Sequence, residues 1–161
     1  MKETLKIRIR AAERGDLPAI VGLLAEDQLG QGREDVSEPL DPCYSEAFEA
    51  LTADPNQELI VLDGGGEIVA TMQLSFLPGL SRKGSWRCQI EAVRVAKDRR
   101  GGGVGRTMVE HALERARARG CRLVQLTSDR TRDDAHAFYS QFGFVDSHLG
   151  FKLELGAEAD S

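Results

Sequence analysis

The sequence has few cysteines and no long hydrophobic run. Its three cysteines, Cys43, Cys88 and Cys121, lie far apart and include no CxxC pair. Neither a disulfide framework nor a zinc site is therefore predicted. No apolar run is long enough to span a membrane, and no charged segment followed by an apolar one opens the chain. We therefore expect a cytoplasmic protein that has no membrane segment and holds no metal.

Positive charge is in the minority as well. The 21 lysines and arginines are outnumbered by 26 aspartates and glutamates, which gives a net charge of -5. Because phosphate neutralisation needs a broad basic surface, no nucleic-acid partner is expected. One segment differs, since it holds several cations and only one acid, Asp98, and so suits a small polyanionic ligand. The cations of this basic island are Arg94, Lys97, Arg99, Arg100 and Arg106.

Hydrophobic periodicity and turn residues predict an α+β fold with a mixed sheet. A chain of 161 residues, 41% of them hydrophobic, is long enough to bury a core of its own. We expect a single domain over residues 1–156 and a flexible tail over 157–161. The predicted strands are 5–10, 58–62, 67–77, 86–95, 123–126 and 151–155, and the predicted helices are 16–26, 45–53, 104–120 and one that starts at Asp133 or Asp134.

The most informative segment joins the strand at 86–95 to the helix that begins at Val104. It contains Gly101, Gly102, Gly103 and Gly105, so backbone N–H groups can approach a ligand closely at the positive end of a helix. A GxGxxG motif fails because Arg106 stands where its last glycine would be. A P-loop fails because no Gly-Lys-Ser/Thr ending is present. The glycines predict either phosphate binding or simply a tight turn.

Two separated motifs resemble the GNAT superfamily of CoA-dependent acyltransferases. The family signature is Arg or Gln, two residues, Gly, one residue, then Gly or Ala, and Arg100, Gly103 and Gly105 match it. The strand Ile90–Val95 and the later segment Ala135–Tyr139, followed by Gly143-Phe144, also look like the family's. The resemblance covers about Trp86 to Phe151. It implies a mixed, mostly antiparallel sheet of about six to seven strands flanked by about four helices.

The resemblance also implies acetyl-CoA as co-substrate. The backbone of the strand segment Val93, Arg94 and Val95 is then expected to bind the pantetheine arm in the way an added strand would. The pyrophosphate is expected at the turn and first helical residues, where the implied ligands are Arg100, Gly101, Gly102, Gly103, Val104, Gly105 and Arg106. Arg132 stands where the family often has Asn, and an arginine there can reach a phosphate.

Two side chains are expected to move protons in such a reaction. Tyr139 resembles the family's general acid, which protonates the departing thiolate, although a tyrosine packed on the sheet is the structural alternative. Glu91 is the candidate base, because a partly buried carboxylate beside the thioester would have a raised pKa. A strand salt bridge is the alternative reading of Glu91. Gln89 and His148 are weaker candidates.

These inferences predict an N-acetyltransferase in which a primary amine attacks the thioester directly, in a ternary complex, while the N–H of Val93 steadies the oxyanion. The acceptor is a small-molecule or peptide amine of unknown identity. Acidic residues at 35, 38 and 41 would favour a cationic acceptor if they face the pocket, and a solvated acidic loop is the alternative. A non-catalytic module that senses acyl-CoA is the second function considered. A homodimer formed through the last strands is also possible.

Overall fold

The computed structural model describes residues 6–27 and 32–156. They form two compact units, one that ends at Leu126 and one that begins at Thr127. The elements of the first unit are β1 (Arg8–Ala11), η1 (Arg14–Asp16), α1 (Leu17–Glu26), α2 (Pro42–Ala53), β2 (Gln57–Asp63), β3 (Ile68–Leu77), α3 (Ser81–Gly84), β4 (Arg87–Val95), η2 (Lys97–Arg99), α4 (Val104–Ala118) and β5 (Leu123–Leu126). The second unit contains α5 (Asp133–Ser140). The single domain expected over 1–156 stays a prediction, and the tail expected over 157–161 lies outside the described residues.

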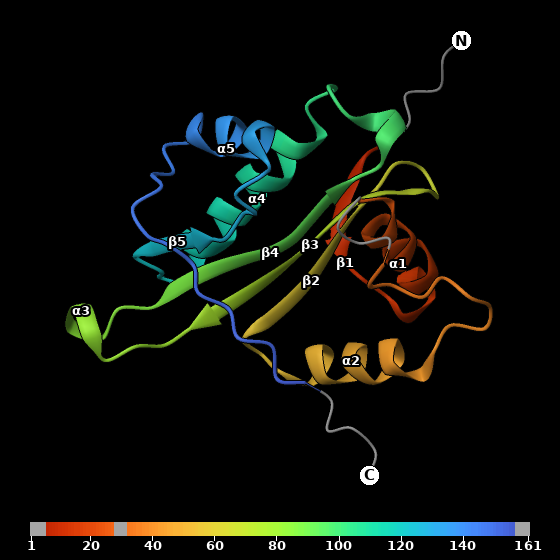
Figure 1. The fold of residues 1–161 in the computed structure, drawn as a ribbon, viewed down its shortest axis with the longest axis horizontal. Helices are drawn as coiled ribbons and strands as arrows, with labels where there is room; N and C mark the ends of the chain where they lie inside the picture. The colour runs from red at the N-terminus through yellow and green to blue at the C-terminus, as the bar shows by residue number, and fades with distance from the viewer. Residues whose placement is uncertain (1–5, 28–31, 157–161) are drawn as a thin grey trace. The chain divides into compact units, whose positions relative to one another are not determined.

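The first unit is built on a mixed sheet whose strands follow the order β1-β2-β3-β4-β5 (Figure 1). Neighbouring strands from β1 to β4 run antiparallel, and β5 runs parallel to β4. The predicted fold class, α+β with a mostly antiparallel mixed sheet, is therefore confirmed. The predicted strand count is too high, because the described residues form five strands.

The strand predicted over 151–155 is wrong. Residues 144–156 form neither helix nor strand, and the side chains of Phe151, Leu153 and Leu155 are 92%, 86% and 89% exposed. The alternation of apolar and polar residues gave the prediction. A strand also needs a neighbour to accept its backbone hydrogen bonds, and alternation does not reveal whether one is present. No strand forms there to serve as the expected dimer edge, and the homodimer itself stays a prediction.

Local hydrogen bonds explain where helix α2 begins and how the β2–β3 turn is formed. Helix α2 starts at Pro42, earlier than expected, because the carboxylate of Asp41 accepts a 2.9 Å hydrogen bond from the N–H of Cys43 and caps the helix. In the turn between β2 and β3, Asp63 accepts hydrogen bonds from the N–H groups of Gly65 and Gly66, at 3.0 and 2.6 Å. Both glycines have positive φ, as this hairpin turn requires.

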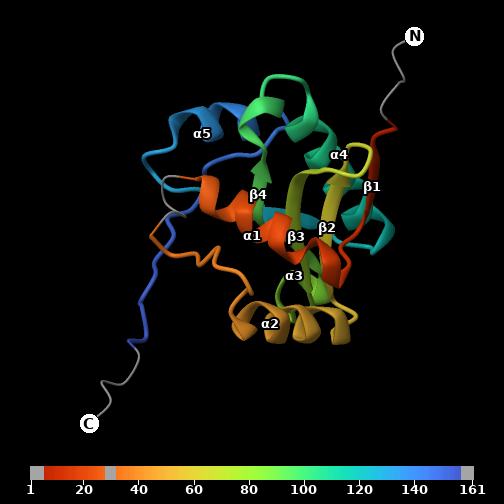
Figure 2. The ribbon, with the colours of Figure 1, turned by 90° about the vertical axis from the view of Figure 1, so that its right-hand side faces the viewer.

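Helices cover both faces of the sheet, with α1 on one side and α4 on the other (Figures 1 and 2). On the α4 side, Arg115 donates to Glu58 of β2 at 3.1 Å, and the Arg119 guanidinium lies 4.3 Å from the centre of the Phe76 ring. Even-numbered residues of β2 from Glu58 to Leu62 and of β3 from Ala70 to Phe76 therefore face α4. The core side chains exposed by 1% or less are Val61, Leu62, Ala70, Met72, Leu74, Phe76, Cys88, Met108, Val109, Ala112 and Ala116.

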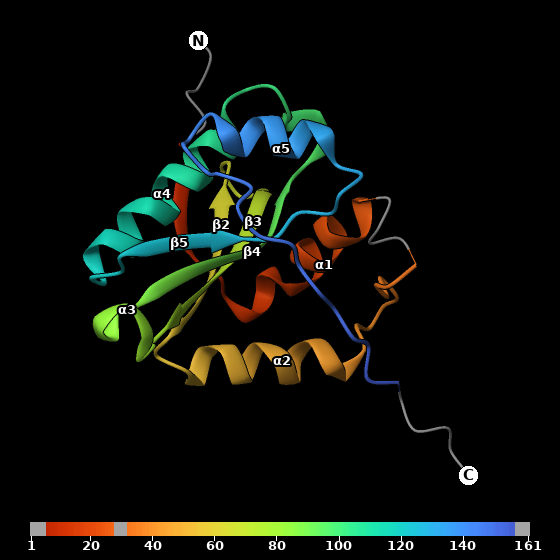
Figure 3. The ribbon, with the colours of Figure 1, turned by 60° about the vertical axis from the view of Figure 1, so that its left-hand side comes forward.

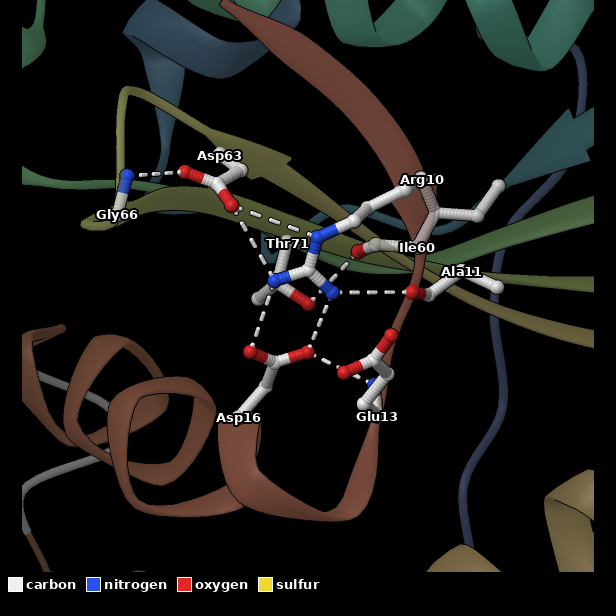
Figure 4. A network of polar contacts seen from close by, with 8 residues as sticks. All are labelled: Arg10, Ala11, Glu13, Asp16, Ile60, Asp63, Gly66 and Thr71. Carbon is white, nitrogen blue, oxygen red and sulfur yellow. Dashed lines mark hydrogen bonds and ion pairs between the residues drawn. The ribbon is translucent and has the colours of Figure 1, made fainter.

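Arg10 ties β1 to the start of α1 and to the β2–β3 turn. Its guanidinium donates two hydrogen bonds to Asp16, at 2.7 and 3.0 Å, and two more to Asp63, at 3.4 Å each (Figure 4). The side chains of Arg10 and Asp16 are 17% and 12% exposed. The bonds from Arg10 hold the pKa of Asp16 below its usual range, whereas the N–H of Gly66 is the main cause of the lowered pKa of Asp63.

Replacing Arg10 with Met should reduce the free energy of unfolding at pH 7 by about 2 kcal/mol, because charge-assisted hydrogen bonds are lost. The pKa of Asp16 is lowered by folding, so this contribution is present above the unfolded-state pKa and is lost as pH falls through the folded one. The difference between wild type and Arg10→Met should thus shrink below about pH 4. Urea denaturation at several pH values measures it. Arg8→Met, which removes the same charge from an exposed residue of β1, is the control, and an equal loss in both variants would contradict the account.

Candidate active site

One edge of β4 is only half covered by its neighbour. β5 pairs with β4 from Arg87 to Ile90, and β5 ends at Leu126. Among residues 6–27 and 32–126, no strand pairs with this edge over Glu91–Val95 (Figure 3). The N–H of Ala96 donates to Val69 of β3 at 2.8 Å. Because backbone groups alternate along a strand, the N–H groups of Val95 and Val93 point away from β3, toward the open edge.

The carbonyl groups on this edge accept hydrogen bonds from arginine side chains. Arg94 Nη1 donates to the carbonyl of Val93 at 2.9 Å, and Arg100 Nε donates to that of Val95 at 3.1 Å. Unpaired backbone groups are costly when they lose water, so these contacts stabilise an edge that no strand covers. The edge thus presents N–H donors, and the binding of a pantetheine arm by Val93 and Val95 stays a prediction.

A β-bulge interrupts β4 beside this open edge. Thr71 of β3 pairs with Arg94 while Gln73 pairs with Glu91, so β4 contains one residue more than β3 between these pairs. Ala92, inside the bulge, has a φ of 52°, which is unfavourable for a residue with a Cβ. Backbone strain of this kind is concentrated at functional sites. The strained conformation could not be predicted from the sequence, because alanine is not a residue that predicts positive φ.

The bulge changes the face to which the later β4 residues belong. Glu91 pairs with Gln73 and therefore lies on the face opposite α4, and Arg94 pairs with Thr71 on that same face. There Arg94 forms a 3.3 Å ion pair with Asp27, just after α1, and the two side chains are only 15% and 10% exposed. The side chain of Arg94 thus binds Asp27. The cofactor contact predicted for Arg94 concerns its backbone, and it stays a prediction.

The glycine turn leads directly into α4. Gly101 and Gly103 have φ values of 80° and 85°, and Gly103 is the N-cap of the helix. No side chain caps the helix, and its first hydrogen bond runs from the N–H of Thr107 to the carbonyl of Gly103 at 3.0 Å. The N–H groups of Val104 and Gly105 precede that bond, at the positive end of the helix, where an anion is favoured. A Cβ at Gly101 or Gly103 would meet nothing within 4 Å, so there is open space beside the turn for an anion.

The two arginines expected at the pyrophosphate are exposed at this turn. Arg106 lies 3.6 Å from Glu110, one helical turn further along α4, and Arg100 binds the carbonyl of Val95. The contacts of both arginines are at the surface, so replacing the Glu110 carboxylate or the Val95 carbonyl with a phosphate costs little free energy. The turn, the helix N-terminus and the open β4 edge follow one another in the chain, so their donors suit a ligand with an amide-containing arm and a pyrophosphate.

Glu91 is exposed, so the partial burial expected for it is not found. Its Oε1 accepts a hydrogen bond from Gln89 Nε2, and Gln89 Oε1 accepts one from Gln125 Nε2 of β5 at 2.9 Å. No salt bridge to Glu91 is found among the described residues, although one was the alternative reading. This chain of amides was not predicted from the sequence. Its signal was the alternation of polar residues along β3 and β4.

Tyr139 and Arg132 belong to the second unit. Tyr139 lies in α5 among aromatic rings, with centroid distances of 5.1 Å to Phe138 and 5.8 Å to Phe144. Arg132 is the N-cap residue of α5, and its N–H donates to the carbonyl of Asp129 at 3.1 Å. The roles predicted for Tyr139 and Arg132 in acid catalysis and cofactor binding stay predictions.

Two of the three cysteines, Cys88 and Cys121, are poorly suited to act as nucleophiles. Cys88 is fully buried in β4, and burial raises the pKa of its thiol to about 12. Burial also raises the pKa of Cys121. Within 6–27 and 32–156, no group of three or more His, Cys, Asp or Glu side chains could hold a metal ion, and no helix is long and apolar enough to cross a membrane.

The model of the acetyltransferase (GNAT) family matches residues 23–144, which include β4, the glycine turn and α5. The chain belongs to the GNAT family of acetyltransferases. An aminoalkylphosphonate N-acetyltransferase of Salmonella typhimurium is 31% identical over 112 residues, which cover 70% of this chain and 72% of that protein. The family resemblance stated from the sequence is thereby confirmed.

Solved structures agree with this assignment. A Bacillus halodurans protein described as a transcriptional regulator is 47% identical, with a TM-score of 0.91 over 93% of this chain and 100% of its own. A protein from Agrobacterium tumefaciens is 34% identical, with a TM-score of 0.81 over 92% of this GNAT chain and 99% of its own. The fold is thus shared over nearly the whole chain.

The glycine turn yields a matched pair of substitutions. Gly103→Ala should lower the free energy of unfolding by about 1 kcal/mol, because an alanine at φ 85° is strained. Gly102→Ala should have little effect on stability, because φ is not positive there and the added Cβ would make an ordinary 3.6 Å contact with the carbonyl of Arg99. Urea denaturation measures both, and equal losses would contradict the conformational argument.

Proposed function

We propose that this GNAT protein is an N-acetyltransferase that moves an acetyl group from acetyl-CoA to a primary amine. The observation that carries the proposal is the presence of two sets of backbone donors, one on the open edge of β4 and the other at the uncapped N-terminus of α4. Val93 and Val95 would bind the pantetheine arm, and the amides from Gly101 to Arg106 would bind the pyrophosphate, with Arg100 at the rim. The family's use of acetyl-CoA supports this assignment.

The proposed reaction is a direct attack in a ternary complex. The amine nitrogen forms a bond to the thioester carbonyl carbon, its proton passes to Glu91, directly or through water, and the carbonyl oxygen takes the negative charge beside the N–H of Val93. The C–S bond then breaks, and Tyr139 gives its proton to the departing sulfur. Exposure of Glu91 to solvent is compatible with a water-mediated transfer. Burial of Cys88 agrees with a route that needs no covalent enzyme intermediate.

The acceptor is proposed to be a small molecule with a primary amine. Support comes from the 31% identical aminoalkylphosphonate N-acetyltransferase. The acidic loop before α2 gives little support for a strongly cationic acceptor. Asp41 caps α2, and Asp35 accepts a 2.9 Å hydrogen bond from the N–H of Ser37, so both carboxylates stabilise the local backbone. We therefore propose no charge class for the acceptor from this loop.

The second candidate is a regulatory module that binds acyl-CoA without turnover. The observation that favours it is the 47% identical Bacillus halodurans protein described as a transcriptional regulator. Both candidates use the same cofactor surface, so binding alone does not distinguish them. Turnover with an amine does.

Calorimetric titration of acetyl-CoA, followed by a thiol-release assay against a panel of amines, tests the proposal. We expect micromolar binding by the wild type and CoA release with at least one amine. Gly103→Ala combined with Gly105→Ala should weaken binding at least tenfold, because methyl groups would crowd the phosphate site. Gly15→Ala combined with Gly22→Ala is the control, since both added Cβ atoms would meet nothing within 4 Å. Binding without turnover would favour the regulatory module, and no binding would contradict both functions.

A further inference from the structure

A row of polar side chains lies on the face of the sheet opposite α4. Register pairs Gln73 with Glu91, Ser75 with Gln89 and Gln89 with Gln125, so these residues of three adjacent strands share one face. Polar side chains in the middle of a sheet reduce its apolar burial, so they call for an explanation other than packing. The proposed base, Glu91, lies at one end of a hydrogen-bonded chain within this row.

That chain has only one consistent direction. An ionised carboxylate only accepts hydrogen bonds, so the Gln89 group that faces Glu91 must be the NH₂. The Gln89 oxygen then faces Gln125, whose NH₂ donates to it at 2.9 Å. Gln125 stands on β5 in the parallel pairing with β4, and both glutamines are half-buried. The sheet therefore holds Gln125 at the far end of the hydrogen-bonded chain. Gln125 in turn orients the amide of Gln89, which binds Glu91.

We propose that Gln89, anchored by Gln125, is a positioning residue for Glu91. This inference rests on the proposed function. By donating to Oε1 of Glu91, Gln89 fixes the rotamer of an exposed side chain and occupies one of its two oxygens. The other oxygen, Oε2, is the one that accepts the proton of the attacking amine, directly or through water. An exposed glutamate without such a partner would sample several rotamers and would spend less time in the productive one.

Gln73 provides a matched comparison. It stands directly opposite Glu91 on β3, yet its NH₂ donates to Gln57 of β2 at 3.2 Å, and the Ser75 hydroxyl donates to the same oxygen of Gln57 at 2.8 Å. Gln73 and Gln89 are thus both half-buried glutamines next to Glu91 on one face, and the structure shows a bond to Glu91 only for Gln89. The same substitution at both positions separates positioning from general polarity.

The test compares Gln89→Met, Gln125→Met and Gln73→Met with the wild type in steady-state acetyl transfer to the best amine of the panel. Methionine keeps the side-chain length and removes both hydrogen-bonding groups. We expect Gln89→Met to lower kcat about tenfold, with the KM for acetyl-CoA unchanged, and Gln125→Met to lower kcat by a smaller factor. Gln73→Met should change kcat less than twofold. A kcat for Gln89→Met within twofold of the wild type, or an equal loss in Gln73→Met, would overturn the positioning role.

A double substitution shows whether the effect runs through Glu91. Glu91→Asp keeps a carboxylate but shortens the side chain, so Gln89 no longer reaches it. Adding Gln89→Met to Glu91→Asp should lower kcat by less than a further twofold, because the two changes break the same interaction. A further tenfold loss of kcat would overturn the positioning role of Gln89. The proposed function, acetyl transfer to an amine, would still stand. If the wild type transfers no acetyl group to any amine, the proposed function itself fails, and the inference fails with it.

Discussion

The candidate site depends on one backbone feature, the point at which β4 loses its neighbour and bulges. β5 covers β4 only to Ile90, and Ala92 then takes a positive φ that adds a residue relative to β3. The end of the pairing leaves N–H donors of Val93 and Val95 on an open edge. The bulge places Glu91 and Arg94 on the same face, away from α4. A regular, fully paired strand would offer neither the donors nor this side-chain arrangement.

The same strand continues into the second part of the site without a long loop. After Val95 come one turn of η2, the glycine turn and the first residues of α4, whose amides have no side-chain cap. Rigid elements on both sides of the turn fix the separation between the edge donors and the helix N-terminus. A ligand that uses both sets of donors therefore meets a preformed surface and loses little binding energy to ordering the protein. Acetyl-CoA, the substrate of the GNAT family, has the chemistry to use both.

Sequence reasoning found the parts of the site whose chemistry is local. The glycine turn, the helix behind it and the buried central strands follow from residue type and periodicity, and the structure has them where they were expected. The bulge at Ala92 and the ion pair between Arg94 and Asp27 were missed, because both depend on how β4 meets β3 and α1. The strand expected over 151–155 was wrong for a related reason, since alternation says nothing about a pairing partner. The exposure of Glu91 also follows from tertiary structure alone.

Amide hydrogen exchange with and without acetyl-CoA, followed residue by residue by NMR, is the most direct test of the central claim. If the open edge of β4 and the N-terminus of α4 together bind the cofactor, the amides of Val93, Val95 and Gly105 become protected at saturating acetyl-CoA. The amide of Ala96, already bonded to Val69, changes little by comparison. Binding that leaves the exchange of Val93, Val95 and Gly105 unchanged would show that acetyl-CoA is held elsewhere, and the account given for this site would be wrong.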